Sequence, residues 1–395
     1  MHKKTDINIS SCRYRFTTAA ISSMAVLVVL LVFIFVVFIQ ESKYEPASEA
    51  IIREAASLSF RNKKPEDLTD QDFAKVRYLM IFNEKLSDTR LLAKFHNLQN
   101  LYFDMVRFPE DAFPRWMKLL AKYGVFDLKE RSYIDLGPLR KLHHLQSLSI
   151  SYTKVKNLKP VGYLKNLHTL NLTGIERLDL KPLKNLSGLQ TLYLKKARPL
   201  KLGSLSKLKN LQNLYIIETD ISDIKHLKNL TSLRKLDMSR TEVNDVTPLQ
   251  NLTNLRELDL SESSVSDIRP FEDLSNLRSL KLFGTDVRDI EPLRGLANML
   301  ELDLTGCKVP DILPVSGLTN MLQFQLAYTK IEDLEPLRDM KNLMTLNLQG
   351  TKVSNLEPLK ELQNLEWLNL KDCILITKTQ IKDLQEALPS LKINR

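Results

Sequence analysis

A repeat with a period of 22 residues constrains this chain more than any other feature of its sequence. Each unit opens on an aliphatic residue, and these residues follow one another at constant intervals: Leu136, Leu158, Leu180, Leu202, Ile224, Val246, Ile268, Ile290, Ile312, Leu334 and Leu356. Around Leu258 and Leu260, leucines alternate with polar residues, which is the period of a β-strand. A single unit cannot bury its own leucines, whereas stacked units can, because each unit covers the next. The sequence therefore predicts a solenoid with parallel strands.

Three further signals recur at fixed places in the unit. Proline stands two residues after the opening residue in nine of the eleven units, where its fixed φ starts a short helical turn. Asp or Asn precedes the opening residue in ten of the eleven units, in a position to cap that turn. An Asn before the third leucine, as at Asn254, and a Thr, Ser or Cys after the strand, as at Thr285, form two ladders. We expect both ladders to point inward and to pair with backbone groups.

This combination of Pro-Leu, Asn-Leu and a ladder Thr resembles the 22-residue repeats of bacterial internalins and of the phosphatase-regulating leucine-rich subunit of eukaryotes. The resemblance covers residues 136–391, about two thirds of the chain. It implies an α/β fold, a leucine-rich-repeat solenoid with a curved parallel sheet on the concave side and short helical or 3-10 turns on the convex side. It also implies a scaffold that binds its partner through variable strand residues.

The N-terminal region predicts a membrane anchor. Lys3, Lys4, Arg13 and Arg15 precede a stretch without charge, and residues 19–39 are apolar and long enough to cross a bilayer as a helix. A cleaved signal peptide is the alternative, but the apolar run is longer than usual and no small-residue cleavage site adjoins it. We therefore expect a single-pass type II membrane protein, with its N-terminus in the cytoplasm and its repeats on the extracytoplasmic side.

The predicted domains follow from these features. They are a cytoplasmic tail (1–18), a transmembrane signal anchor (19–39), a stalk (40–69), an N-terminal cap with irregular repeats (70–135), the regular repeats (136–373) and a C-terminal cap (374–395). In the irregular part, residues 114–123 have the pattern of a basic amphipathic helix, which would touch a membrane or partner, or pack on its own repeat.

Charge is uneven along the repeats. Residues 127–210 contain 17 Lys and Arg against 5 Asp and Glu, whereas residues 211–395 contain 22 against 28. The basic half, which includes Lys165 and Lys184, would attract an anionic surface or an acidic partner, or would simply keep an exposed face soluble. Nucleic acid is an unfavourable partner, because the C-terminal half is acidic and the repeats are expected outside the cell.

The outward strand positions hold the candidate binding site. Large side chains at these positions have no core to fill, and aromatic anchors beside charges are typical of interaction hot spots. The predicted partner-binding residues are Tyr193, Tyr215, Ile217, Asp237, Asp259, Lys281, Phe283 and Asp303. The alternative is a concave face that is merely hydrophilic.

No pattern of catalytic or metal-binding residues accompanies this site. The six histidines lack metal-ligand spacing, and the sequence contains no Gly-rich phosphate loop or nucleophile elbow. We therefore expect a non-enzymatic protein without metal or cofactor, which binds a protein or surface macromolecule that the sequence does not name. The alternative is a passive structural or envelope scaffold without a single cognate ligand.

Overall fold

The computed structural model describes residues 48–60, 63–81, 88–104, 133–176, 178–198 and 200–395. The chain divides into two compact units, Met1–Pro46 and Ala47–Arg395, and every described residue belongs to the second. The predicted anchor, residues 19–39, and the predicted helix at 114–123 lie outside the described residues. Within the described ranges, no helix has the length and apolar character needed to cross a membrane.

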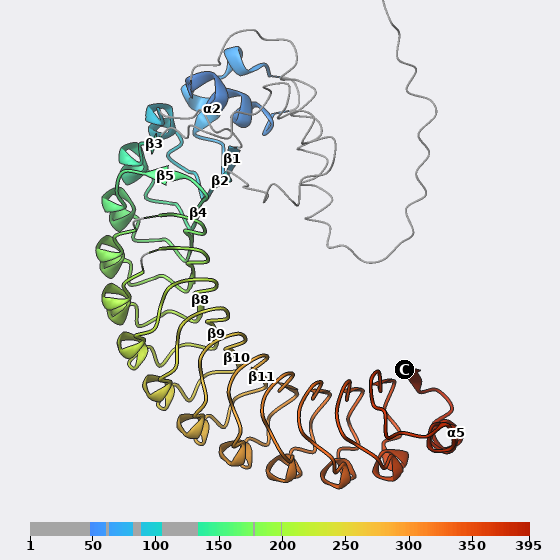
Figure 1. Ribbon diagram of the computed structural model, residues 1–395. Coiled ribbons are helices and arrows are strands. Elements are labelled where there is room, and N and C mark those ends of the chain that lie inside the picture. The colour runs from blue at the N-terminus through green and yellow to red at the C-terminus, as the bar shows by residue number, and fades with distance from the viewer. Residues whose placement is uncertain (1–47, 61–62, 82–87, 105–132, 177, 199) are drawn as a thin grey trace, which may run out of the picture. The chain divides into compact units, whose positions relative to one another are not determined.

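The second unit contains a parallel sheet of 14 strands that follow one another in chain order, apart from β3 and β5 (Figure 1). The strands are β1 (Tyr78–Ile81), β2 (Asn100–Asp104), β4 (Ser147–Ser151), β6 (Thr169–Asn171), β7 (Thr191–Tyr193), β8 (Asn213–Tyr215), β9 (Lys235–Asp237), β10 (Glu257–Asp259), β11 (Ser279–Lys281), β12 (Glu301–Asp303), β13 (Gln323–Gln325), β14 (Thr345–Asn347), β15 (Trp367–Asn369) and β16 (Lys392–Asn394). Between β4 and β15, each residue pairs with the residue 22 positions later, as Leu258 does with Leu280. The predicted parallel solenoid is confirmed.

Short 3-10 turns lie on the side of the repeats opposite the strands (Figure 1). They are η3 (Pro65–Asp67), η4 (Arg90–Lys94), η6 (Gly137–Lys141), η7 (Lys159–Tyr163), η8 (Lys181–Asn185), η9 (Gly203–Lys207), η10 (Lys225–Leu227), η11 (Thr247–Leu249), η12 (Arg269–Phe271), η13 (Glu291–Leu293), η14 (Leu313–Val315), η15 (Glu335–Leu337) and η16 (Glu357–Glu361). The Asp or Asn before the opening residue caps the turn in ten of the eleven units, as expected: Asp245 Oδ1 accepts the N–H of Thr247 at 2.9 Å. The spacing of Asp and Pro thus predicts the turns correctly.

The two polar ladders differ in burial. The Thr ladder is buried, and its hydroxyls donate to the carbonyl three residues earlier, as Thr285 does to Leu282 at 2.8 Å. The Asn ladder is exposed, so its predicted inward orientation is wrong. Its amides still bridge consecutive units, since Asn254 Nδ2 donates to the carbonyl of Thr231 at 2.8 Å. A backbone acceptor at the surface is enough to hold these side chains.

The N-terminal cap begins earlier than the expected boundary at residue 70. Helix α2 (Ser48–Ser57), which lies within the expected stalk, buries Ile51, Ile52, Ala55 and Ala56 in the common core. Their spacing of three and four residues places them on one helical face.

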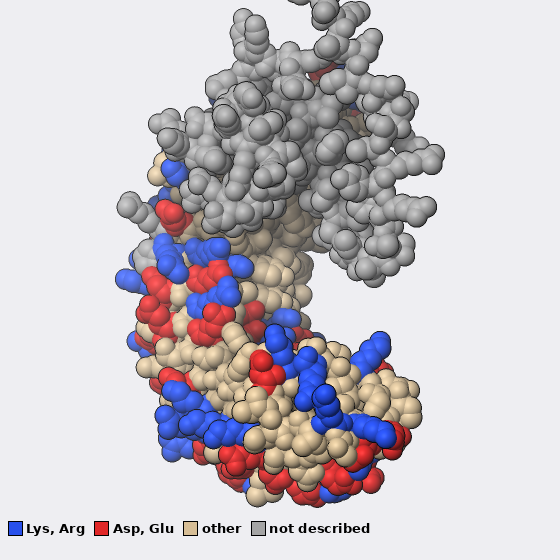
Figure 2. Space-filling model, turned by 45° about the vertical axis from the view of Figure 1, so that its right-hand side comes forward, with Lys and Arg blue, Asp and Glu red and all other residues tan. Residues whose placement is uncertain are grey.

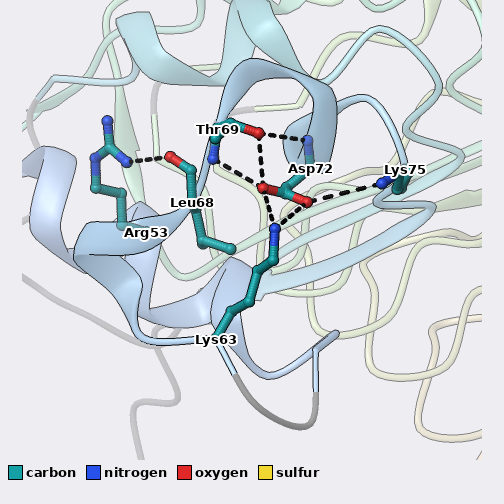
Figure 3. A network of polar contacts seen from close by, with 6 residues as sticks. All are labelled: Arg53, Lys63, Leu68, Thr69, Asp72 and Lys75. Atoms are coloured by element: carbon teal, nitrogen blue, oxygen red, sulfur yellow. Dashed lines mark hydrogen bonds and ion pairs between the residues drawn. The ribbon is translucent and has the colours of Figure 1, made fainter.

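A buried carboxylate holds the next part of the cap together (Figure 3). Helix α3 (Asp70–Phe73) begins with a capping box in which Thr69 and Asp72 satisfy each other's backbone N–H groups. Both oxygens of Asp72 also accept hydrogen bonds from Lys63 Nζ, at 2.8 and 2.7 Å. The Lys63 hydrogen bonds, followed by those from Thr69, hold the pKa of the Asp72 carboxyl well below its usual range.

The remaining elements interrupt or end the regular stack. Asn100 of β2 pairs with Ser147 of β4, which marks the irregular segment between them. Strands β3 (Tyr133–Ile134) and β5 (Lys154–Val155) form a separate two-stranded sheet. At the C-terminus, helix α5 (Lys378–Ala387) begins at a capping box of Thr377 and Gln380, and β16 pairs with β15 to complete the sheet.

Candidate functional site

Six of the eight predicted site residues form one continuous row across strands β7 to β12. The sheet register pairs Tyr193 with Tyr215, Tyr215 with Asp237, and so on across the following strands. We call this the aromatic–acidic row, and its members are Tyr193, Tyr215, Asp237, Asp259, Lys281 and Asp303. They alternate with buried residues such as Leu258, which is 1% exposed, so their side chains point away from the core.

A stacked pair of tyrosines forms the first part of this row. The rings of Tyr193 and Tyr215 are nearly parallel, at 6°, with centroids 4.5 Å apart. Lys235 Nζ lies 5.8 Å from the centre of the Tyr215 ring and forms an ion pair with Glu257. Partial burial raises the pKa of the Tyr215 hydroxyl, and the Glu257 hydrogen bond raises the pKa of Lys235. The pair is thus a preformed aromatic surface beside a fixed cation.

Ile217 and Phe283 lie outside the row, two residues after the strand positions of Tyr215 and Lys281. Ile217 is partly buried and lies two residues beyond Tyr215 along the chain, whereas Phe283 is 40% exposed. Three repeats separate these two residues, which is about 14 Å at the usual strand spacing of about 4.8 Å. Ile217 therefore belongs to the same repeat as Tyr215, whereas Phe283 lies three repeats away from it.

The aspartates of the row have a structural role that the sequence analysis did not assign. Asp237 Oδ1 accepts the backbone N–H of Ser239 at 3.0 Å and its hydroxyl at 2.7 Å. Asp259 and Asp303 accept the N–H two residues later in the same way. Burial is the main cause that raises the pKa of Asp237. These carboxylates cap the backbone at the strand ends. The recurring Asp-x-Ser or Asn-x-Thr pattern in the sequence could have indicated this capping role.

A hollow of about 630 Å³ lies over strands β9 to β13. Asp237, Asp259 and Lys281 contribute to its lining, but the other five predicted site residues do not. Arg256 and Arg278, which directly precede β10 and β11, also line the hollow. Neither arginine is among the predicted site residues, because both lie directly before a strand and not at an outward position within it.

The basic half contains a second hollow, of about 410 Å³, between turns η7 and η8. Four exposed lysines line it together with Gly162 and Tyr163: Lys159, Lys165, Lys181 and Lys184. Gly162 allows the two turns to approach, because a Cβ there would lie 2.9 Å from the carbonyl oxygen of Pro182. On the face seen in Figure 2, basic and acidic side chains are interspersed over much of the described surface.

The described residues contain no group of three His, Cys, Asp or Glu side chains that could hold a metal ion. Cys307 and Cys373 are buried, free thiols in the Thr ladder. The Cys307 Sγ donates to the carbonyl of Leu282 at 3.1 Å, and burial raises the pKa of its thiol. These thiols replace ladder hydroxyls as packing groups.

A parallel sheet built from stacked 22-residue units, with capped 3-10 turns and a buried Thr ladder, is the architecture of a leucine-rich-repeat solenoid. The family model described as Leucine Rich repeats (2 copies) matches residues 231–276. No curated protein sequence matches the chain significantly.

Solved structures show the same fold. An internalin (inlF) from Listeria monocytogenes has a TM-score of 0.65 at 22% identity, over 82% of this chain and 97% of that chain. A leucine-rich-repeat protein of Leptospira interrogans has a TM-score of 0.54 at 18% identity, over 82% and 97%. The functional domain of InlJ from Listeria monocytogenes has a TM-score of 0.53 at 18% identity, over 80% and 72%. The internalin-like repeat pattern thus corresponds to an internalin-like fold.

Proposed function

We propose that this protein binds another protein through its concave face, at the aromatic–acidic row and the adjoining Ile217. The single observation that carries the proposal is the stacked pair of Tyr193 and Tyr215. Both rings project from the sheet and are partly exposed, so the core of the solenoid does not require them. Rigid aromatic side chains lose little conformational entropy on binding, and they dominate interaction hot spots.

The surroundings of the pair support a protein partner. Ile217 extends its apolar surface, and the ion pair of Lys235 and Glu257 borders it. An apolar centre with a polar border is the usual anatomy of a protein interface. The aspartates of the row contribute less than expected, because one oxygen of each already accepts a backbone hydrogen bond.

Affinity capture with the isolated unit 47–395 tests this proposal. The fragment includes α2, whose side chains belong to the core. Tyr215→Ala should weaken capture of the partner by about 1–4 kcal/mol without loss of the fold. Tyr163→Ala is the matched control, since that tyrosine is 62% exposed on turn η7.

A second comparison separates the concave face from the basic half. Changing Lys165 and Lys184 to Ala should alter mainly the salt dependence of capture. If these lysine changes abolish capture and Tyr215→Ala has no effect, then the basic surface is functional and the proposal is wrong.

We also propose that residues 19–39 anchor the protein in a membrane, with the repeats on the extracytoplasmic side. The support is the uncharged apolar run behind Lys3, Lys4, Arg13 and Arg15. Protease added to intact cells should remove the repeats and spare the N-terminus. Protected repeats, or a secreted protein that lacks residues 1–40, would exclude this topology.

A further inference from the structure

The residues directly before each strand form a second row, three residues before the aromatic–acidic row along each strand. Over six consecutive strands, β9 to β14, these residues are three arginines followed by three apolar residues: Arg234, Arg256, Arg278, Leu300, Leu322 and Met344. We call this row the rim stripe. From Arg256 onward, the backbone N–H of each member donates to the carbonyl of the member one repeat earlier, at 2.8–2.9 Å. The six residues are therefore held side by side on neighbouring strands.

The three arginines have no charged partner among the residues that the structure describes. Their side chains are exposed, and no ion pair or side-chain hydrogen bond joins them to any residue that the structure describes. These arginines follow one another on neighbouring strands, whose backbones lie about 4.8 Å apart, and their like charges repel one another. The stripe thus presents three like charges on consecutive strands, beside a hollow whose lining also contains Asp237, Glu257, Asp259 and Glu301.

The acids near the arginines are already engaged. Glu257 forms an ion pair with Lys235, and Glu301 lies 3.3 Å from Lys281 Nζ while accepting the Ser279 hydroxyl at 2.6 Å. Asp237 and Asp259 accept backbone N–H groups at the strand ends. These contacts leave the guanidinium groups available to an external carboxylate, which an arginine fork can bind in a bidentate manner.

The other half of the stripe is apolar and accessible. Leu300 and Leu322 are half-buried, and Met344 is 38% exposed. Arg256, Arg278, Leu300 and Leu322 all line the same hollow of about 630 Å³. The cationic and the apolar halves therefore belong to one continuous surface rather than to two separate patches.

We propose that the rim stripe binds an extended polypeptide segment with carboxylates at one end and apolar side chains at the other. Five strand spacings of about 4.8 Å give a stripe of roughly 24 Å, which an extended chain of roughly seven residues spans at about 3.4 Å per residue. This inference rests on the proposed protein-binding function and names the kind of partner. A sulfated polysaccharide or a nucleic acid would satisfy the arginines but would have no apolar side chains for Leu300, Leu322 and Met344.

The test uses the immobilised full-length chain and a phage-displayed library of random peptides about eight residues long, which covers the stripe. The enriched peptides should carry acidic residues in one half and apolar residues in the other, in one consistent order. The affinity of a synthetic enriched peptide is then measured by fluorescence anisotropy. The variant Arg256→Ala/Arg278→Ala should bind this peptide about tenfold more weakly, because it loses two exposed ion pairs with the peptide. Met344→Ser should weaken the affinity a few-fold.

The matched control is Arg294→Ala/Arg338→Ala. These arginines lie next to turns η13 and η15 and are paired with Glu291 and Glu335. Their replacement changes the net charge of the chain by the same amount as the replacement of Arg256 and Arg278. The control should change the affinity less than twofold. An equal loss in both double variants would mean non-specific attraction and would overturn the proposal. The proposal would also be overturned if no peptide is enriched, or if the enriched peptides lack acidic residues. It would likewise be overturned if heparin displaces the enriched peptide equally well from the wild type and from the Met344→Ser variant.

The same variants separate this inference from the proposed function. If Tyr215→Ala abolishes capture of the partner and the Arg256→Ala/Arg278→Ala variant captures it normally, the aromatic–acidic row stands and the rim stripe is excluded. If peptide binding requires the arginines while Tyr215→Ala leaves capture unchanged, the stripe stands and the site proposed at the tyrosines falls.

Discussion

A residue with positive φ follows every strand of the regular repeats, and in two places it lies under a tyrosine ring. Tyr328 covers Gly350, where a Cβ would lie 2.7 Å from Tyr328 Cδ1. Gly284 has a closely similar backbone, with φ of +68° against +66°, but a Cβ there would meet nothing nearer than Glu262 Cγ at 3.7 Å. A comparison of these two glycines therefore separates backbone strain from steric overlap. We predict that Gly350→Ala lowers the free energy of unfolding more than Gly284→Ala does.

The magnitudes follow from two terms. A left-handed conformation costs an L-residue roughly 1–2 kcal/mol, and the lower entropy of the unfolded alanine variant offsets roughly 0.4–1 kcal/mol. Gly284→Ala should thus lose about 1 kcal/mol of unfolding free energy. Gly350→Ala also displaces the Tyr328 ring and breaks the 2.6 Å hydrogen bond from Gln349 Nε2 to the Tyr328 hydroxyl. That bond is worth about 0.5–1.5 kcal/mol, so the total loss should be about 2 kcal/mol.

Urea melts followed by circular dichroism measure the difference, provided that the m-value is unchanged. In a Tyr328→Ala background, the cost of Gly350→Ala should fall to that of Gly284→Ala, because the overlap is gone. Equal losses for the two glycine variants in the wild-type background would refute the reasoning. An excess that persists without the Tyr328 ring would refute it as well.

Three further predictions concern the core, the cap and the site. Leu258→Ala, at a strand leucine that is 1% exposed, should cost about 2–5 kcal/mol in urea melts, whereas Glu257→Ala should cost less than about 1 kcal/mol because its ion pair with Lys235 is exposed. The lowered pKa of Asp72 means that its stabilising contribution is complete above the unfolded pKa of about 3.9 and is lost as the pH falls toward its lower folded pKa. The difference in unfolding free energy between wild type and Asp72→Asn should therefore be constant near neutral pH and should narrow below about pH 4. Phe283→Ala should weaken capture of the partner less than Tyr215→Ala, since Phe283 stands apart from the tyrosine pair.

The sequence predicts the repeat architecture well because each signal acts within one unit. Proline and the aspartate before the opening residue determine the turn, and the paired register follows from the period itself. The N-terminal boundary is less accurate, because α2 is short and its apolar face shows its role only where it meets the core. The Asn ladder could not be placed from its period, since a bridging amide functions equally well buried or exposed.

The site was predicted only in part, for two physical reasons. The aspartates of the row recur because they cap the backbone locally, so their periodicity indicates structure more than binding. The arginines of the rim stripe lie one residue before the strands, where alternation no longer defines an inward and an outward face. Only the register of the strands shows that these arginines lie side by side and that their charges are concentrated in one row.

The tyrosine pair interrupts the capping pattern, and this yields the last prediction. Six strands have an Asp or Asn here that accepts the N–H two residues later. Tyr193 and Tyr215 offer no such acceptor to Lys195 and Ile217, and neither do the residues at the same position of β4, β11 and β13, which are Ser149, Lys281 and Gln325. Departures from a locally consistent pattern are expected where function requires them. Tyr215→Asn would restore the capping hydrogen bond, worth about 0.5–1.5 kcal/mol, and would lose a stacking contact of about the same size. We therefore expect nearly unchanged stability in urea melts together with weakened capture of the partner. If Tyr215→Asn instead lowers the unfolding free energy by more than about 2 kcal/mol and leaves capture intact, then the stacked pair stabilises the sheet and does not bind the partner.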